Sequence, residues 1–430
     1  MAAVLHHVMN LLSANFKTIP SLLPFLSLAP SSIQAASSLN PNGYLTVRDS
    51  RTGRSYTLPI INSAIEAMQF MYQSGLKVMD LGLQNTAVGE SSITKIDGIR
   101  GSIHYRSHSI LDLAETQCFE SVAFLLIWGH LSSAVELQKF RLALFEAGRP
   151  EQVVIDCIAS FPRSAPTQTL ILAGLAAWAS VDHSALPSEM GRDIYSNDIR
   201  FIDAKIPRSI SALGTIVAMS YCHTNSIPFT YPTSSPSATS TASPFVTNIL
   251  TMMNYVDPIT QRPRAEDVAT LSKLWILYAD HALTPSTSSF LLTASTLADP
   301  LTSASCAIAT AYGPLHGGAI DMAYKTIREV GSVDNVTTLI GEVVRKEKRL
   351  PGYGHRVYRV PDPRVGIIKE MLAQPSLSKR LDGQGREREG DGFLKVALEI
   401  DAQAQQHPYF VKRRLHANAD LFGAFVYTAM

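Results

Sequence analysis

Apolar residues recur at helical spacing along most of the chain. From about residue 119 onward they return every three or four positions, which places them on one face of an α-helix. The pattern predicts helices over Phe119 to Trp128, Ala134 to Ala147, Gln168 to Ala179, Ile210 to Tyr221, Phe245 to Met253, Ala265 to Ala279, Phe290 to Ala311, Ala319 to Val330 and Val336 to Lys346. We therefore predict an all-α fold.

Strict alternation of apolar and polar residues is confined to two short regions before the first helix. Tyr44 to Arg48 and Ser55 to Leu58 flank a turn with Gly53, and Ile93 to Ile96 and Ser102 to Tyr105 flank Asp97-Gly98. Each pair predicts a small β-hairpin. Two further stretches have loop composition: 232–244 is rich in Ser, Thr and Pro, and 379–392 is charged and rich in glycine.

The first 43 residues are expected to form a disordered arm. The first 48 residues contain no Asp or Glu and only Lys17 and Arg48 as fixed positive charges. A mitochondrial presequence is usually richer in arginine, so it is kept only as an alternative. The compartment therefore stays open between cytoplasm and mitochondrion.

Charge and composition exclude several classes of protein. Lys and Arg total 37 against 36 for Asp and Glu, so the net charge of +1 provides no field for nucleic acid or a membrane surface. No apolar run is long enough for a membrane-spanning helix. Four isolated cysteines, Cys118, Cys157, Cys222 and Cys306, disfavour a disulfide framework and a cysteine-rich zinc site.

The segment from Tyr312 to Asp321 has the most informative chemistry. His316 is followed by two glycines, which let the backbone approach a ligand, and then by a predicted helix. The helix dipole opposes protonation there, so a neutral imidazole could donate an N–H hydrogen bond to a carbonyl. A turn histidine that caps the helix is the alternative.

A glycine-rich loop follows about forty residues later. Its sequence is Leu350-Pro-Gly-Tyr-Gly-His355-Arg-Val-Tyr-Arg359, followed by Asp362-Pro-Arg364. Free loop amides beside His355 and several arginines suit an anionic substrate, although a solvated basic loop would have the same composition. His281, at the end of the helix from Ala265, is a third candidate, and a favourable C-terminal charge would explain it equally.

Asp420 opens the apolar run Leu421 to Tyr427. A carboxylate at such a position is usually a helix cap. Opposite a neutral His316, however, it would be a base that removes a proton α to a carbonyl.

Sequence motifs of other enzyme classes are absent. We find no Walker A loop, dinucleotide-binding fingerprint, nucleophile elbow or H-E-x-x-H zinc motif. His104 and His108 are four residues apart but flank a predicted strand. A zinc enzyme built on this pair is a distant alternative.

Taken together, the segments resemble the citrate synthase family in order and context. The resemblance runs from about Tyr44 to the end of the chain. It is carried by Asn85-Thr-Ala, Ile93 to Gly98, Ala204 to Arg208, Ala279 to His281, Gly313 to Gly318, Gly352 to Tyr358, Asp362 to Arg364 and Asn418 to Asp420. It implies a helical homodimer with a large domain, here 44–316, and a small domain, here 317–430, with the active site in the cleft between them. It implies no metal and no cofactor besides the acyl-CoA substrate.

The resemblance also implies a role for each candidate residue. His316 would polarise the thioester carbonyl of an acyl-CoA, Asp420 would remove its α-proton, and His355 would activate the ketone of oxaloacetate. Oxaloacetate would be held by His281 and Arg364. The CoA site would be lined by Pro351, Gly352, Tyr353, Gly354 and Arg359.

The chain departs from the family pattern in two places. Family members continue beyond the helix after the aspartate and return to the large domain with two further substrate-binding arginines. That return segment is missing before Met430, so a truncated, non-catalytic relative is an alternative. Locally, Asn418 to Leu421 followed by Phe425-Val-Tyr427 looks like the fungal methylcitrate and alkylcitrate synthases. We predict an alkylcitrate synthase of secondary metabolism with a longer acyl donor; the alternative is an ordinary citrate or 2-methylcitrate synthase.

Overall fold

The structure is a computed structural model that describes residues 40–80, 83, 86–181, 199–233, 242–381 and 392–430. Residues 1–39 of the predicted arm, and most of the two predicted loops at 232–244 and 379–392, lie outside these ranges. The chain divides into two compact units, whose described parts lie in 40–90 and in 91–430. The predicted domain boundary between 316 and 317 stays a prediction.

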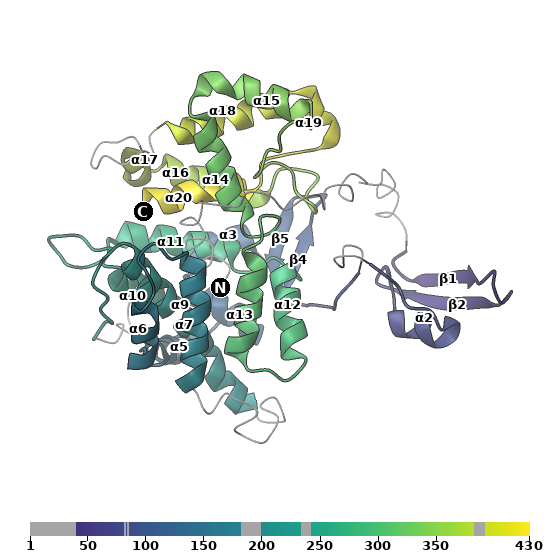
Figure 1. Cartoon of the computed structure of the whole chain (residues 1–430), viewed down its shortest axis with the longest axis horizontal. Helices are drawn as coiled ribbons and strands as arrows, with labels where there is room; N and C mark the ends of the chain where they lie inside the picture. The colour runs from purple at the N-terminus through teal and green to yellow at the C-terminus, as the bar shows by residue number, and fades with distance from the viewer. Residues whose placement is uncertain (1–39, 81–82, 84–85, 182–198, 234–241, 382–391) are drawn as a thin grey trace. The chain divides into compact units, whose positions relative to one another are not determined.

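The first unit is built on a hairpin. Strand β1 (Gly43–Arg48) pairs antiparallel with β2 (Ser55–Ile61), which also pairs with the two-residue β3 (Ala64–Ile65). Helix α2 (Ala67–Ser74) follows (Figure 1). The sequence-based prediction of a hairpin here is confirmed.

The second unit begins with the other predicted hairpin, which is also confirmed. Strands β4 (Thr94–Asp97), β5 (Ser102–Tyr105) and β6 (His108–Ser109) form an antiparallel sheet in that order. Its tip lies against a later loop: the backbone N–H of Arg359 donates to the Gly98 carbonyl at 2.8 Å. A β-carbon on Gly98 would lie 2.2 Å from the Val357 carbonyl oxygen, so only glycine fits there.

Most of the second unit is helical, as predicted (Figure 1). Its helices are α3 (Ile110–Thr116), α4 (Phe119–Trp128), α5 (Ala134–Ala147), α6 (Gln152–Ala159), α7 (Thr167–Val181), α9 (Ile199–Thr224), α10 (Pro244–Met252), α11 (Ala265–Tyr278), α12 (Pro285–Ala294), α13 (Pro300–Ala311), α14 (Ala319–Val330), η5 (Val333–Asn335), α15 (Val336–Val344), α16 (Pro363–Ala373), α17 (Pro375–Leu381), α18 (Phe393–Gln406), α19 (Pro408–Arg413) and α20 (Ala419–Ala429). Among the described residues, no helix is both long and apolar enough to span a membrane.

Three predicted element boundaries were wrong. The helix predicted over Ile210 to Tyr221 starts at Ile199, and Pro207, a residue that usually ends a helix, lies inside it. The apolar pattern over Phe290 to Ala311 belongs to two helices, α12 and α13, because Leu297 adopts a left-handed φ of 65° and Asp299 caps a new helix that starts at Pro300. The stretch 379–381, predicted as loop, forms the end of α17. Apolar residues continue through the connection at Leu297 and Ala298, so their spacing alone does not reveal the break.

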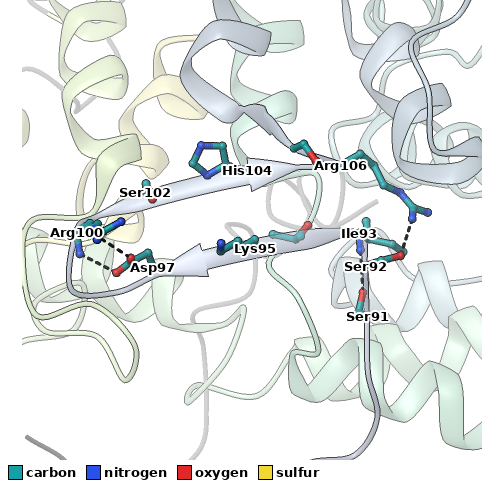
Figure 2. Close-up of a pocket in the computed structure, with 11 residues that line it drawn as sticks. Ser91, Ser92, Ile93, Lys95, Asp97, Arg100, Ser102, His104 and Arg106 are labelled. Carbon is teal, nitrogen blue, oxygen red and sulfur yellow. Dashed lines mark hydrogen bonds and ion pairs between the residues drawn. The ribbon is translucent and has the colours of Figure 1, made fainter. Parts of the chain in front are cut away.

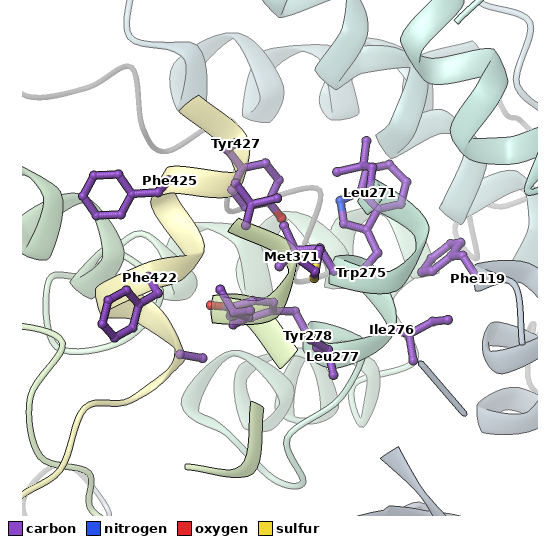
Figure 3. Close-up of a cluster of buried hydrophobic side chains, with 14 of the residues drawn as sticks. Phe119, Leu271, Trp275, Ile276, Leu277, Tyr278, Met371, Phe422, Phe425 and Tyr427 are labelled. Carbon is purple, nitrogen blue, oxygen red and sulfur yellow. The ribbon is translucent and has the colours of Figure 1, made fainter. Parts of the chain in front are cut away.

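The core that positions the site lies where α11 meets the C-terminal helices. Figure 3 shows Trp275 and Tyr278 of α11 on the side toward which Tyr427 of α20 points, with Met371 of α16 between the two helices, whereas Phe422 and Phe425 lie on the opposite side of α20. The two helices approach closely at Gly423, where a β-carbon would lie 2.3 Å from the Tyr278 hydroxyl oxygen. The start of α20 is therefore fixed against the end of α11.

Candidate active site

His316 lies in the turn that leads into α14. The turn is closed by the His316 N–H, which donates to the Gly313 carbonyl at 2.9 Å, and α14 begins three residues later as predicted. Gly318 is required because a β-carbon there would lie 2.5 Å from the Tyr312 carbonyl oxygen. The ring Nε2 of His316 forms a 2.8 Å hydrogen bond with the Ser286 hydroxyl of α12. Sequence reasoning missed Ser286 as the partner that orients this imidazole.

The other two candidate histidines meet in a partly buried cluster. The rings of His281, just after α11, and His355 are 5.3 Å apart between centroids. Tyr358 lies beside both: its hydroxyl is 2.9 Å from His281 Nε2, and its ring centroid is 4.6 Å from that of His355. The structure thus brings together two predicted residues that are far apart in sequence.

Both histidines of this cluster are held neutral. Burial, and then the positive charge of Arg364, lower the pKa of His281 to about 3. The same two causes, in the same order, lower the pKa of His355. The Nδ1 of His355 accepts the Val357 backbone N–H at 3.1 Å, so the neutral ring carries its proton on Nε2. His355 is therefore a hydrogen-bond donor through Nε2.

Arg364 is tied to a buried counterion. Its Nε and Nη2 donate to the two carboxylate oxygens of Asp362 at 3.0 and 2.7 Å, and the side chains are only 9% and 1% exposed. Asp362 also caps α16 and accepts the Ala419 backbone N–H at 3.2 Å. The guanidinium lies 5.3 Å from the centre of the Tyr278 ring. Among the described residues, Nη1 of Arg364 makes no hydrogen bond, so its N–H groups could bind a substrate carboxylate.

Asp420 is the second residue of α20, which Asn418 caps by accepting the Asp420 backbone N–H at 3.0 Å. The Asp420 side chain is thus not needed as the cap, contrary to the usual role of a carboxylate at this position. Its charge acts on the Tyr278 hydroxyl, whose pKa is raised well above normal, first by burial and next by Asp420. It also acts on His355.

The glycine-rich loop is attached to the strand-like segment before Asp420. Asn418 donates its backbone N–H to the Gly352 carbonyl at 3.0 Å and its side-chain amide to the Gly354 carbonyl at 3.0 Å. Both glycines have left-handed φ angles, of 76° and 88°. The hydroxyl of Tyr353 donates to Asp401 at 3.3 Å, so its side chain points into α18. The N–H groups of Tyr353 and Gly354 donate to the Leu350 and His416 carbonyls at 3.2 and 2.7 Å, so these loop amides are not free as the sequence predicted. The role of Pro351 to Gly354 at the CoA stays a prediction.

Arg359 lies at the far end of the same loop. Its Nη1 donates to the His355 carbonyl at 3.4 Å, and its backbone N–H is held by the β4–β5 hairpin. The inner face of that hairpin reaches the site as well, because the Tyr105 hydroxyl donates to the Asp280 carbonyl at 3.0 Å and Thr94 hydrogen-bonds to the Asp280 carboxylate. The hairpin thus supports the loop of His355 and the residue before His281.

A polar pocket of about 620 Å³ lies on the outer face of the same hairpin. Figure 2 shows Lys95 and His104 on neighbouring strands, with Arg100 at the hairpin tip. His104 and His108 were the pair considered for zinc. Among the described residues, no group of three potential metal ligands is found.

Comparison with known proteins shows to which family the chain belongs. A protein-family model described as "Citrate synthase, C-terminal domain" matches residues 82–430. The chain belongs to the citrate synthase family. The resemblance inferred from the motifs is thereby confirmed, and so is the all-α fold.

Several citrate synthase relatives are fungal. The citrate synthase-like protein oryE of Aspergillus oryzae is 40% identical over 90% of this chain and 86% of its own length. The alkylcitrate synthase phiJ of a fungal species is 34% identical over 92% of this chain and 86% of its own length. The citrate synthase of Thermoplasma acidophilum, solved as a ternary complex with carboxymethyl coenzyme A and oxaloacetate, has a TM-score of 0.68 and 25% identity, covering 82% of this chain and 85% of its own.

Proposed function

We propose that this citrate synthase-type enzyme condenses a longer-chain acyl-CoA with oxaloacetate and releases CoA, which is the reaction of an alkylcitrate synthase in secondary metabolism. The observation that carries the proposal is the cluster in which the neutral, partly buried His281 and His355 lie beside the buried Arg364. Such a cluster suits a small ketone with carboxylate groups. The similarity to two alkylcitrate synthases, phiJ and tstJ, favours the longer donor.

The condensation begins with removal of a proton. Asp420 takes the α-proton of the acyl-CoA, while His316 donates a hydrogen bond to the thioester oxygen and stabilises the enol or enolate. Ser286 holds the His316 ring in place through its hydroxyl. The placement of His316 opposite Asp420 across one pocket stays a prediction.

Carbon–carbon bond formation follows at the histidine and arginine cluster. The enolate carbon attacks the ketone carbon of oxaloacetate, and the Nε2–H of His355 donates to the ketone oxygen as negative charge develops there. His281 and Nη1 of Arg364 hold the substrate, with the Pro351 to Gly354 loop and Arg359 at the CoA. Water then hydrolyses the thioester of the product and releases free CoA. We expect the enzyme to act as a homodimer.

The reaction is tested by following free thiol. The protein is incubated with oxaloacetate and, in separate reactions, acetyl-, propionyl- or hexanoyl-CoA. We expect thiol release that depends on oxaloacetate, with the highest kcat/KM for hexanoyl-CoA. A preference for acetyl- or propionyl-CoA would instead identify an ordinary citrate or 2-methylcitrate synthase. Silence with every donor, together with CoA binding but no oxaloacetate binding in calorimetry, would identify a non-catalytic relative.

Ser286→Ala tests the orientation of His316. Because one hydrogen bond is worth about 0.5–1.5 kcal/mol, we expect kcat to fall about 2- to 13-fold with little change in the KM for oxaloacetate. Steady-state kinetics of thiol release would measure both constants. Ser288→Ala, on the same helix, is the matched control. Equal kcat values for the two variants would show that Ser286 does not orient the imidazole.

A further inference from the structure

A second carboxyl group lies close to the proposed base. Asp321 is in the first turn of α14 and Asp420 in the first turn of α20, and these two helices pack against each other. Near their starts, the Ile320 side chain lies 3.5 Å from the position that a β-carbon on Gly423 would take. Further along, the Tyr324 and Phe425 rings meet edge to face at 5.5 Å. The helix starts are therefore held at a fixed, short separation.

The Asp321 carboxyl is placed where a charge is unfavourable. Its Oδ1 is buried and has no hydrogen-bond partner within the described residues. No basic side chain among the described residues forms an ion pair with the Asp321 carboxyl. A buried carboxylate without a cation or donors is costly, whereas a buried carboxylic acid is not.

We propose that Asp321 and Asp420 form a carboxyl pair in which Asp321 stays protonated while Asp420 acts as the base, so that Asp321 is a positioning residue whose ionisation stops condensation at alkaline pH. This inference rests on the proposed function. The packing of α14 and α20 brings the two carboxyl groups together. A charge on Asp321 matters because the proposed reaction itself develops negative charge nearby.

The electrostatics of the pair support this assignment. Burial, and then repulsion by the Asp420 carboxylate, raise the pKa of Asp321 to about 8. The other titratable groups that face the pair are Tyr312 beside Asp321, Tyr278 and His355 beside Asp420, and His316, which the proposed reaction places opposite Asp420. Both tyrosines have raised pKa values and stay neutral near pH 8, and His355 is neutral there. Asp321 is therefore the group of this cluster expected to titrate near pH 8.

Ionised Asp321 would oppose the chemistry in two ways. The enolate gains negative charge close to the pair, and oxaloacetate carries two negative charges into the same site. Each is disfavoured by an additional fixed negative charge in a region shielded from water. If only the protonated form of Asp321 is active, kcat/KM falls about tenfold for each pH unit above its pKa.

The test combines kinetics with a direct titration. For kinetics, kcat/KM is measured from pH 6.5 to 9.5 and normalised to the value of each variant at pH 7. We expect the wild type and Asp321→Glu to decline above about pH 8, and Asp321→Asn to lose that decline because an amide cannot ionise. Asp334→Asn, an exposed acid in η5, is the control and keeps the wild-type profile. An unchanged decline in Asp321→Asn would overturn the proposal.

The titration does not depend on activity. Carbon-13 NMR of the full chain, labelled at its aspartate carboxyl carbons, should show one group that titrates near pH 8. That signal should be absent from Asp321→Asn and should move to lower pH in Asp420→Asn, which lacks the repelling charge. Ordinary acidity of Asp321, near pH 4, would overturn the carboxyl pair. If the signal behaves as expected but no acyl-CoA reacts, the proposed function fails while the pair stands.

Discussion

Replacing Asp420 with asparagine is expected to lower the rate of CoA release by about 10²- to 10⁴-fold, the usual contribution of a general base. Asparagine has nearly the same shape but cannot accept the α-proton. Because Asn418 rather than Asp420 caps α20, the helix should still form. The effect should appear in kcat for every acyl-CoA used, measured by thiol release at saturating oxaloacetate.

Asp334→Asn is the matched control for this variant, because it removes an exposed carboxylate outside the site. Far-ultraviolet circular dichroism would show whether the helical content of Asp420→Asn is retained. A folded Asp420→Asn enzyme whose kcat stays within threefold of the wild type would exclude Asp420 as the base.

Asp362→Ala is expected to lower the free energy of unfolding by about 3–5 kcal/mol, the cost of leaving one partner of a buried ion pair uncompensated. The change also removes the cap of α16 and the acceptor of the Ala419 N–H. Urea unfolding followed by circular dichroism would measure it. Asp362→Asn, which keeps an oxygen for the cap, should be destabilised less and still fold.

The exposed pair Arg345 and Glu347 is the matched control, since its 2.8 Å contact is nearly as short as the 2.7 Å contact of the buried pair. Glu347→Ala should leave the urea midpoint almost unchanged because water and salt screen this pair. The difference in unfolding free energy between the wild type and Asp362→Ala should depend on pH. The pKa of Asp362 is lowered in the folded protein, so its contribution is present above the unfolded pKa, near 4, and is lost as pH falls through the folded value. Equal midpoints for the two variants would contradict the account.

Much of the fold could be predicted because its signals are local. The hairpins at 44–58 and 93–105 follow from alternation around glycine turns, and α4, α11 and α14 follow from helical spacing. Helices α2, α3, α6 and α16 to α19 were not predicted. The last four begin in segments where proline, charge and glycine dominate the composition. Their burial depends on contacts with α20, with α15 and, for α19, with α18, which no local pattern contains.

The site shows the same division. The motif residues His316, His355 and Asp420 could be selected from sequence because glycines and helix starts surround them. Their partners could not. Ser286 reaches His316 from a helix 30 residues earlier, and Tyr358 joins His281 across 77 positions. Asp362 had a readable signal, an aspartate before proline at a helix start, but its second role as the counterion of Arg364 appears only in three dimensions.

The absence of a side chain at position 98 has a consequence far along the chain. Any larger residue there would push on the backbone that follows His355, because the nearest atom is a main-chain carbonyl and not a flexible side chain. Deep mutational scanning for growth or turnover should therefore show that substitutions at Gly98 are tolerated as poorly as substitutions at the candidate histidines, although Gly98 need not contact a substrate.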